Sequence, residues 1–432
     1  MTKNLFTRML QASLMCCLAM VLTGCEELFS ALDNPIQTSI SMSTSEVKLK
    51  VGEQNQRTAT SASPATIVYA SEDPAIATVD ANGVVTGVAP GTTTITASVA
   101  AVDYWTAAST SYKVTVLPAF TMETTPLTFE AAVDGAKVMF NINSTHATGP
   151  VEYSTDGSTW SPYTSGTYIN LAKAGDKVSF RGNNATYAGD YGCSTFTCIY
   201  DCYVYGNIMS LVKAEGFENE TTLTADYTFK SLFFFNGFIK NHPEATHYLV
   251  LPATKLTKQC YYAMFQDCSG LTTTPVIDVD CNGASQAMQY MFDNCPNLTT
   301  VAKGSKISGT MGSSCCEGMF YNCTALESVP SGLLPSTNLA DGCYKKMFNG
   351  CSKLEKAPKL PATSLASSCY DSMFYGCTIL NEAWVKANYN YSYSECISMF
   401  DNCADSGVLH TDGTGWYADT NLPTNWTTSA YE

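Results

Sequence analysis

Residues 343–365 read CYKKMFNGCSKLEKAPKLPATSL, and the motif at their centre, Met-Phe-x-x-Cys, returns at nearly constant intervals along the second half of the chain. The six copies begin at Met264, Met291, Met319, Met347, Met373 and Met399. A degenerate copy precedes them at 232–236, where Asn236 takes the place of the cysteine. The copies are 26–28 residues apart, and a period of this length is typical of chains that stack one structural unit on the next. This repeat therefore decides the fold of the second half.

The spacing of apolar residues within each copy indicates its local structure. Leu339, Cys343 and Met347 are spaced i, i+4, i+8, which places them on one face of an α-helix. The residues from Leu354 to Pro358 then have the composition of a short extended segment. We therefore predict that residues 207–409 form an α/β solenoid, in which each copy has a helical side and an extended side. The extended segments would line one broad face.

The pattern C-Y-x-x-M-F-x-G-C-x-x-L-x-x-A-P-x-L-P-A-T, best represented by residues 343–365, resembles the BspA-like leucine-rich-repeat surface proteins of Bacteroidota. The resemblance covers about half of the chain. Two copies depart from the pattern: Ala287 takes the place of the first cysteine, and Cys396 lies one residue closer to its methionine. The resemblance implies a leucine-rich-repeat fold, and adhesion or host-protein binding at the cell surface.

The cysteines follow the repeat. Sixteen of them come after Cys25, and the second repeat column consists of Cys268, Cys295, Cys323, Cys351, Cys377 and Cys403. Since free cysteine is among the most buried residue types, we interpret the columns as ladders of buried thiols; disulfides are the alternative, because export would permit them. Zinc is disfavoured because C-x₂-C spacing and nearby histidines are absent. A disulfide is expected between two of Cys193, Cys198 and Cys202.

The segment that precedes the repeats predicts two β-rich domains. In residues 38–118, alternating runs such as 94–99 are separated by turns at Asn82-Gly83 and Pro90-Gly91, which favours a β-sandwich. The stretch SEDPAIATVDANGVVTGVAPGTTTITA, residues 71–97, resembles the bacterial Ig-like domain of group 2. That resemblance implies a spacer or adhesion module without catalytic residues.

Residues 119–206 contain further strand-like runs, with hairpin signals at Asp134-Gly135 and Asp156-Gly157, and predict a second small β-sandwich. Residues 410–432 are interpreted as a C-terminal cap. The expected fold class is thus mainly β plus an α/β solenoid: an Ig-like β-sandwich, a second small β-sandwich and a leucine-rich-repeat solenoid.

The N-terminus has the pattern of a bacterial lipoprotein. A basic start and a short apolar run, within residues 1–24, lead directly to Leu22-Thr23-Gly24-Cys25. This sequence resembles the lipobox, in which cleavage precedes a lipid-modified cysteine; the alternative is an ordinary signal peptide with an incidental cysteine. Residues 25–37 would form a tether. Acidic Glu26 and Glu27 resemble a surface-export signal, so we expect a lipid-anchored outer-membrane protein exposed at the cell surface.

Composition and motifs limit the classes of function. A formal net charge of −15 argues against nucleic acid or anionic lipid as a partner, because both require basic surfaces. None of the four histidines, His146, His242, His247 and His410, has a helix-spaced partner, and no nucleophile elbow or phosphate-binding loop is present. We therefore expect no enzyme activity, no metal and no cofactor.

The candidate binding residues lie beside the leucines of the extended segments. They are Thr272, Thr299, Glu327, Glu355 and Glu382. The alternative for each of them is a soluble spacer, and this is the commoner role for any single surface residue. The expected function is adhesion or protein recognition, with a host or extracellular-matrix protein as partner. The alternative is glycan binding for nutrient uptake, for which Trp105, Trp160, Trp384, Trp416 and Trp426 would supply aromatic platforms, although buried structural tryptophans are more common.

Overall fold

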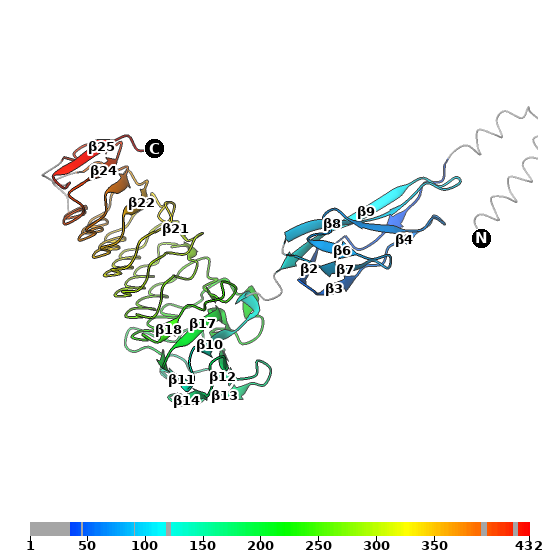
Figure 1. Ribbon diagram of the computed structural model, residues 1–432, viewed down its shortest axis with the longest axis horizontal. Coiled ribbons are helices and arrows are strands. Elements are labelled where there is room, and N and C mark those ends of the chain that lie inside the picture. Colours follow the sequence, from blue (N-terminus) through cyan, green and yellow to red (C-terminus); the bar gives the residue numbers. More distant parts are fainter. Residues whose placement is uncertain (1–34, 45, 90, 118–121, 390–394, 418–421) are drawn as a thin grey trace, which may run out of the picture. The chain divides into compact units, whose positions relative to one another are not determined.

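The computed structural model describes residues 35–44, 46–89, 91–117, 122–389, 395–417 and 422–432 (Figure 1). It divides into two compact units, Met1–Thr121 and Met122–Glu432. Cys25 and the expected leader lie outside the described residues. Within the described ranges, no helix combines the length and the apolar composition needed to cross a membrane.

The first unit contains two larger sheets that pack on a common core, and a two-stranded sheet formed by β1 and β4. Its strands are β1 (Ile40–Ser41), β2 (Val47–Lys50), β3 (Gln54–Gln56), β4 (Thr60–Ser61), β5 (Val68–Ser71), β6 (Ala77–Val79), β7 (Val84–Gly87), β8 (Gly91–Val99) and β9 (Ala108–Leu117). One sheet has the order β2-β9-β8-β5 and the other β3-β7-β6. Val47, Ile95 and Val114 of the first sheet share a buried core with Ala77 and Val85 of the second. The predicted Ig-like β fold is confirmed.

The second unit begins with two further sheets. Its first elements are η1 (Met122–Thr124), β10 (Leu127–Ala131), β11 (Ala136–Asn141), β12 (Val151–Ser154), β13 (Ser161–Pro162), β14 (Tyr168–Leu171), β15 (Lys177–Gly182), β16 (Thr195–Ile199), β17 (Cys202–Asn207), η2 (Ile208–Leu211), η3 (Phe217–Asn219), β18 (Ile239–Lys240) and β19 (Leu249–Val250). The larger sheet runs β13-β12-β15-β10-β17-β18, with β19 also paired to β17, and the smaller runs β14-β11-β16. Aromatic rings join the two sheets: Phe196 of β16 lies 4.9 Å from Phe129 of β10 and 5.0 Å from Phe180 of β15.

The repeats follow as a stack of turns and short parallel strands, which Figure 1 shows in chain order from green to red. The strands are β20 (Asp278–Asp280), β21 (Lys306–Ser308), β22 (Lys356–Leu360), β23 (Glu382–Val385), β24 (Ser406–His410) and β25 (Asn425–Ser429). They form two separate sheets, β20-β21 and β22-β23-β24-β25. The predicted α/β leucine-rich-repeat solenoid is wrong, because the described residues contain no α-helix and only three short 3-10 helices.

The Met-Phe-x-x-Cys segments are runs of tight turns, and residues 314–323 illustrate the reason. The N–H of Met319 donates to the carbonyl of Cys316 three residues back, whereas the N–H of Phe320 donates to the carbonyl of Met347 in the next copy. An α-helix would send both bonds four residues back within the same segment. Ser314, Gly318 and Asn322 also have positive φ angles of 52°, 58° and 54°, which interrupt a right-handed helix. The turn unit repeats every four residues, so the i, i+4, i+8 spacing predicted a helix that does not form.

We predict that Asn322 distinguishes a turn from a helix by which of two substitutions, glycine or valine, destabilises the chain more. Because φ is 54° at this position, Asn322→Gly should change the free energy of unfolding by less than about 0.5 kcal/mol, since glycine adopts this conformation freely. Asn322→Val should cost about 1–2 kcal/mol, because a β-branched side chain is strongly disfavoured at positive φ whereas asparagine tolerates it. Urea unfolding of both variants measures the difference. A larger loss for glycine than for valine would contradict the turn assignment.

The buried core of the second unit continues from the sheets into the repeats. Phe196 lies 5.8 Å from Phe233 of the degenerate copy, and Phe233 lies 5.2 Å from Phe265. Stacked phenylalanine pairs then continue through Phe292, Phe320, Phe348, Phe374 and Phe400, with centroid separations of 5.1–5.7 Å. We call this row the phenylalanine column. All of these rings are buried, so one apolar core extends from β10 to the last copy.

The repeat cysteines are free thiols, as the ladder interpretation predicted. In the second column each thiol donates to the carbonyl of the phenylalanine in the preceding copy: Cys323 Sγ lies 3.1 Å from Phe292 O, and Cys351 Sγ 3.1 Å from Phe320 O. Burial raises the pKa of Cys323 well above its usual value, which keeps the donor proton in place. The disulfide expected between two of Cys193, Cys198 and Cys202 is absent. All three of these cysteines, which lie within the described residues, are free thiols.

Candidate functional site

Four of the five predicted binding residues lie in one row. Thr272, Thr299, Glu327 and Glu355 each come directly after a buried leucine: Leu271, Leu298, Leu326 and Leu354. The N–H of Thr299 donates to Thr272 O at 2.9 Å, and the N–H of Glu327 donates to Thr299 O at 2.9 Å. Side chains of this row are exposed, except for that of Thr299, which is half-buried. The backbone hydrogen bonds thus join Thr272, Thr299 and Glu327 at the surface, and Glu355 holds the equivalent position after its own leucine.

The fifth residue, Glu382, lies in the neighbouring row. Its strand partner is Lys356 rather than Glu355, and the N–H of Asn381 donates to Glu355 O instead. Glu382 forms an ion pair with Lys356 at 2.7 Å and lies 3.3 Å from His410 Nε2. It therefore belongs to the outward side of the sheet formed by β22 to β25.

This outward side carries a connected set of aromatic and charged side chains. Trp384 pairs with Lys359 on one neighbouring strand and with His410 on the other. We call the surface the C-terminal face; it consists of Lys356, Lys359, Glu382, Trp384, Lys386, His410 and Tyr431. Apart from exposed Lys356, these side chains are half-buried, so their rims remain accessible. The parallel strands hold Lys356, Lys359, Glu382, Trp384 and His410 in register, while Lys386 and Tyr431 come just after the ends of β23 and β25.

The charged side chains of the C-terminal face shift one another's pKa in the direction that favours the charged forms. The Lys356 ammonium lowers the pKa of Glu382, and His410 contributes in the same direction. Hydrogen bonding to Glu382 in turn raises the pKa of Lys356. Lys359 and Lys386 lie over the ring of Tyr431 at 6.0 and 5.7 Å, within cation–π distance. A chain with a net charge of −15 thus carries a local group of three lysines around an aromatic centre.

Side chains from both neighbouring strands contact the Trp384 ring. The His410 ring stacks on it at 4.8 Å with an interplanar angle of 9°, and Lys359 lies over it at 6.0 Å from the centroid. A sugar ring stacks on an open aromatic face, whereas this arrangement presents the ring edge and cationic groups. The geometry therefore suits contact with a protein side-chain surface better than stacking against a glycan.

Two other tryptophans are structural. Trp416 and Trp426 are only 5% and 3% exposed, and they pack against Phe400 at 6.0 and 5.3 Å, where they cover the end of the phenylalanine column. Trp160 is half-buried under the Arg181 guanidinium, which lies 4.3 Å from its ring. None of the three presents two open aromatic faces.

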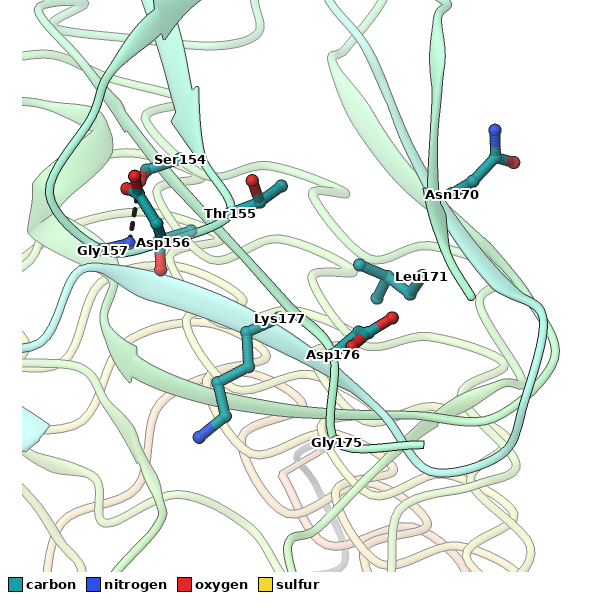
Figure 2. Close-up of a pocket in the computed structure, with 10 residues that line it drawn as sticks. Ser154, Thr155, Asp156, Gly157, Asn170, Leu171, Gly175, Asp176 and Lys177 are labelled. Carbon is teal, nitrogen blue, oxygen red and sulfur yellow. Dashed lines mark hydrogen bonds between the residues drawn. The ribbon is translucent and has the colours of Figure 1, made fainter. Parts of the chain in front are cut away.

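A separate hollow of about 570 Å³ lies at the end of β12, β14 and β15 (Figure 2). Its polar groups are used by the local turns. Asp156 Oδ1 accepts the N–H groups of Ser158 and Thr159 at 2.8 and 2.6 Å, and these bonds hold its pKa well below the usual value. Lys177 forms an ion pair with Glu130 at 3.2 Å. The residues lining this hollow thus offer no unengaged acid–base pair.

Comparison with known families concerns the first unit. Residues 36–109 match the bacterial Ig-like domain (group 2). The match spans β1 to the start of β9 and agrees with the two-sheet core described above. No curated protein matches the chain. A bacterial Ig-like domain indicates a surface or protein-interaction role.

Within the bacterial Ig-like domain, Trp105 is half-buried and forms backbone bridges with Ile36 and Val102. It therefore closes a local loop. Among the residues of the C-terminal face, sequence analysis identified Glu382 and considered Trp384 as a sugar platform, but it missed Lys359, Lys386 and Tyr431. Only the parallel register places these positions beside Trp384, because no constant sequence interval connects them.

Proposed function

We propose that this protein recognises another protein through its C-terminal face. The observation that carries the proposal is the half-buried Trp384 ring, on which His410 stacks and over which Lys359 lies. Tryptophan and cationic side chains at the centre of a patch are typical of residues that dominate binding energy at protein interfaces. Rigid parallel strands limit the entropy lost when these side chains are fixed on binding.

The charge of the face specifies the chemistry of the partner. The three lysines of the face outnumber its single carboxylate, that of Glu382, which pairs with Lys356. Since the chain as a whole has a net charge of −15, an acidic protein surface would be attracted to this face and repelled by much of the remaining molecule. We infer a host or extracellular-matrix protein with an acidic epitope. Binding of this kind weakens as salt concentration rises.

The proposed location is the cell surface. Lipid attachment at Cys25 would anchor the chain in the outer membrane, and the bacterial Ig-like domain at 36–109 would follow the anchor as a spacer. Protease treatment of intact cells tests this display: loss of an epitope from residues 122–432, with a periplasmic protein retained, is expected. Survival of that epitope while a known surface protein is degraded would rule out exposure.

Binding of the soluble chain, beginning at Ser30, to arrays of matrix proteins and glycans tests the recognition. We expect a saturable signal on an acidic protein. Trp384→Ala should weaken that signal by about 30-fold or more, because hot-spot truncations cost at least about 2 kcal/mol. Trp160→Ala removes a half-buried tryptophan outside the face and should leave binding unchanged. A saturable signal on glycans alone, or equal loss in both variants, would refute the proposal.

A further inference from the structure

The segment between β18 and β19 is held at both ends by a single strand. Ile239 and Lys240 pair with the start of β17, and Leu249 and Val250 pair with its end. Both pairings are parallel, so residues 241–248 form a loop that leaves the edge of β17 and returns to it. The loop reads NHPEATHY and contains two of the four histidines of the chain.

Three metal-binding side chains converge in this loop. His242, Glu244 and His247 each offer a ligand atom, and these atoms all lie within 4.8 Å of one another. Glu244 Oε2 is 3.3 Å from His247 Nδ1, and the two imidazole rings stack with centroids 4.3 Å apart. The histidine side chains are 8% and 16% exposed, and Glu244 is 68% exposed. The two histidines are therefore largely shielded from solvent, whereas the Glu244 carboxylate is accessible to it.

The hydrogen bonds of His242 define which of its nitrogens can act as a ligand. The N–H of Glu244 donates to His242 Nδ1 at 3.0 Å, so the Nδ1 lone pair is engaged in the metal-free chain and a cation bound at Nδ1 would replace this bond. The opposite nitrogen, Nε2, lies 3.7 Å from Glu130 Oε1. Histidine ligands commonly direct their second nitrogen toward a carboxylate, which fixes the ring and strengthens the ligand. Glu130 occupies that outer position.

The supporting residues come from the larger sheet. Tyr205 donates its hydroxyl to Glu130 Oε2 at 2.8 Å, and Lys177 forms an ion pair with the same carboxylate at 3.2 Å. The histidine rings rest on two tyrosines of β17: Tyr203 lies 4.8 Å from His242, and Tyr205 lies 4.9 Å from His247. These aromatic contacts hold both histidine side chains at the base of the loop, and a shared cation would require the two stacked rings to rotate so that their lone pairs converge.

We propose that His242, Glu244 and His247 form a binding site for a late first-row divalent cation, of which Zn²⁺ is the expected occupant. Two imidazole nitrogens and one carboxylate oxygen are the donor set that Zn²⁺ accepts, with a fourth position left for water. Magnesium and calcium prefer oxygen-rich sites and fit this set poorly. A bound cation would cross-link the loop and stabilise the junction at which the repeats leave the edge of β17.

The test is titration of the purified, chelator-treated full chain with Zn²⁺ by calorimetry, supported by the absorption spectrum of the Co²⁺ form. We expect one Zn²⁺ per chain and a Co²⁺ spectrum of low coordination number. His247→Ala should abolish binding, and Glu244→Gln should weaken it at least tenfold. Glu130→Gln should weaken binding about tenfold, the effect typical of an outer carboxylate.

His146→Ala is the matched control, because His146 lies outside the loop and contacts Tyr191 O. It should bind Zn²⁺ like the unmodified chain. Glu244 is largely exposed, so Glu244→Gln tests the site without endangering the fold, and circular dichroism in chelator checks this. Failure of the chain to bind stoichiometric Zn²⁺, or equal affinity in Glu244→Gln, would overturn the proposal. So would binding that survives His247→Ala and disappears when thiols are alkylated.

Discussion

Replacing Phe320 with alanine is expected to lower the free energy of unfolding of residues 122–432 by about 3–5 kcal/mol, the range observed for large core truncations. Phe320 is fully buried and stacks between Phe292 and Phe348 at 5.5 and 5.4 Å. Alanine would leave a gap in the middle of the phenylalanine column, because the copies on either side are fixed by backbone hydrogen bonds to one another. The cavity could therefore collapse only partially.

Chemical denaturation with tyrosine and tryptophan fluorescence measures the loss. Phe235→Ala is the control, since Phe235 is 68% exposed and its replacement removes little buried surface. It sits at a positive φ of 58°, so alanine introduces no new backbone strain relative to phenylalanine. An effect of Phe320→Ala no larger than that of the control would show that the column does not stabilise the stack.

Replacing Phe196 with alanine is expected to destabilise the sheets and the repeats together, again by about 3–5 kcal/mol. Phe196 stacks on Phe140 at 3.9 Å with an interplanar angle of 7°. It also lies 5.8 Å from Phe233 at the start of the column. The Phe196 ring thus belongs to a core that the sheets and the repeats share. Its loss should therefore destabilise both of these parts.

Hydrogen exchange resolved by segment distinguishes this shared core from two independent ones. In Phe196→Ala, protection should fall in β10 to β17 and in the first repeat copies, while the bacterial Ig-like domain keeps its own protection because it belongs to a separate compact unit. Tyr191→Ala is the control, since that side chain is 91% exposed. Loss of protection limited to β10–β17 would indicate that the repeats fold independently.

Several features of the fold followed directly from the sequence. Alternation in β8, where every second residue from Thr93 to Val99 is buried, predicted a sheet with one buried side. The Met-Phe-x-x-Cys period located the stacked copies and their buried columns. The prediction of a helix within each copy was wrong. Its cause is that a four-residue turn unit and an α-helix both place positions i, i+4 and i+8 on the same side.

A local signal against the helix was present in the motif. The residue before each second-column cysteine is Asp267, Asn294, Asn322, Gly350, Gly376 or Asn402, and every one has a positive φ. Aspartate, asparagine and glycine are the residues that tolerate this conformation. Their recurrence within what would be a helix interior favours turns, and it outweighs an apolar spacing that both structures share.

The candidate site residues also divide into those that the sequence could align and those that only the fold brings together. Thr272, Thr299, Glu327 and Glu355 could be aligned from sequence because each follows a buried leucine of the repeat. Glu382 lies in the next row because it follows Leu380 by two residues, whereas each of the other four follows its leucine by one. His242, Glu244 and His247 share no face of a regular helix or strand, so only the fold of their loop brings them together.

The sequence by itself determined the Ig-like β unit, the period of the repeats and the burial of their cysteines, because these depend on alternation, spacing and residue type along the chain. Only the tertiary structure decided that the copies contain turns, that Phe196 joins the sheets to the repeats, and which residues surround Trp384. The physical reason is that these features depend on hydrogen bonds and ring contacts between segments 20 or more residues apart. Their partners are selected by register and packing, and no local pattern specifies them.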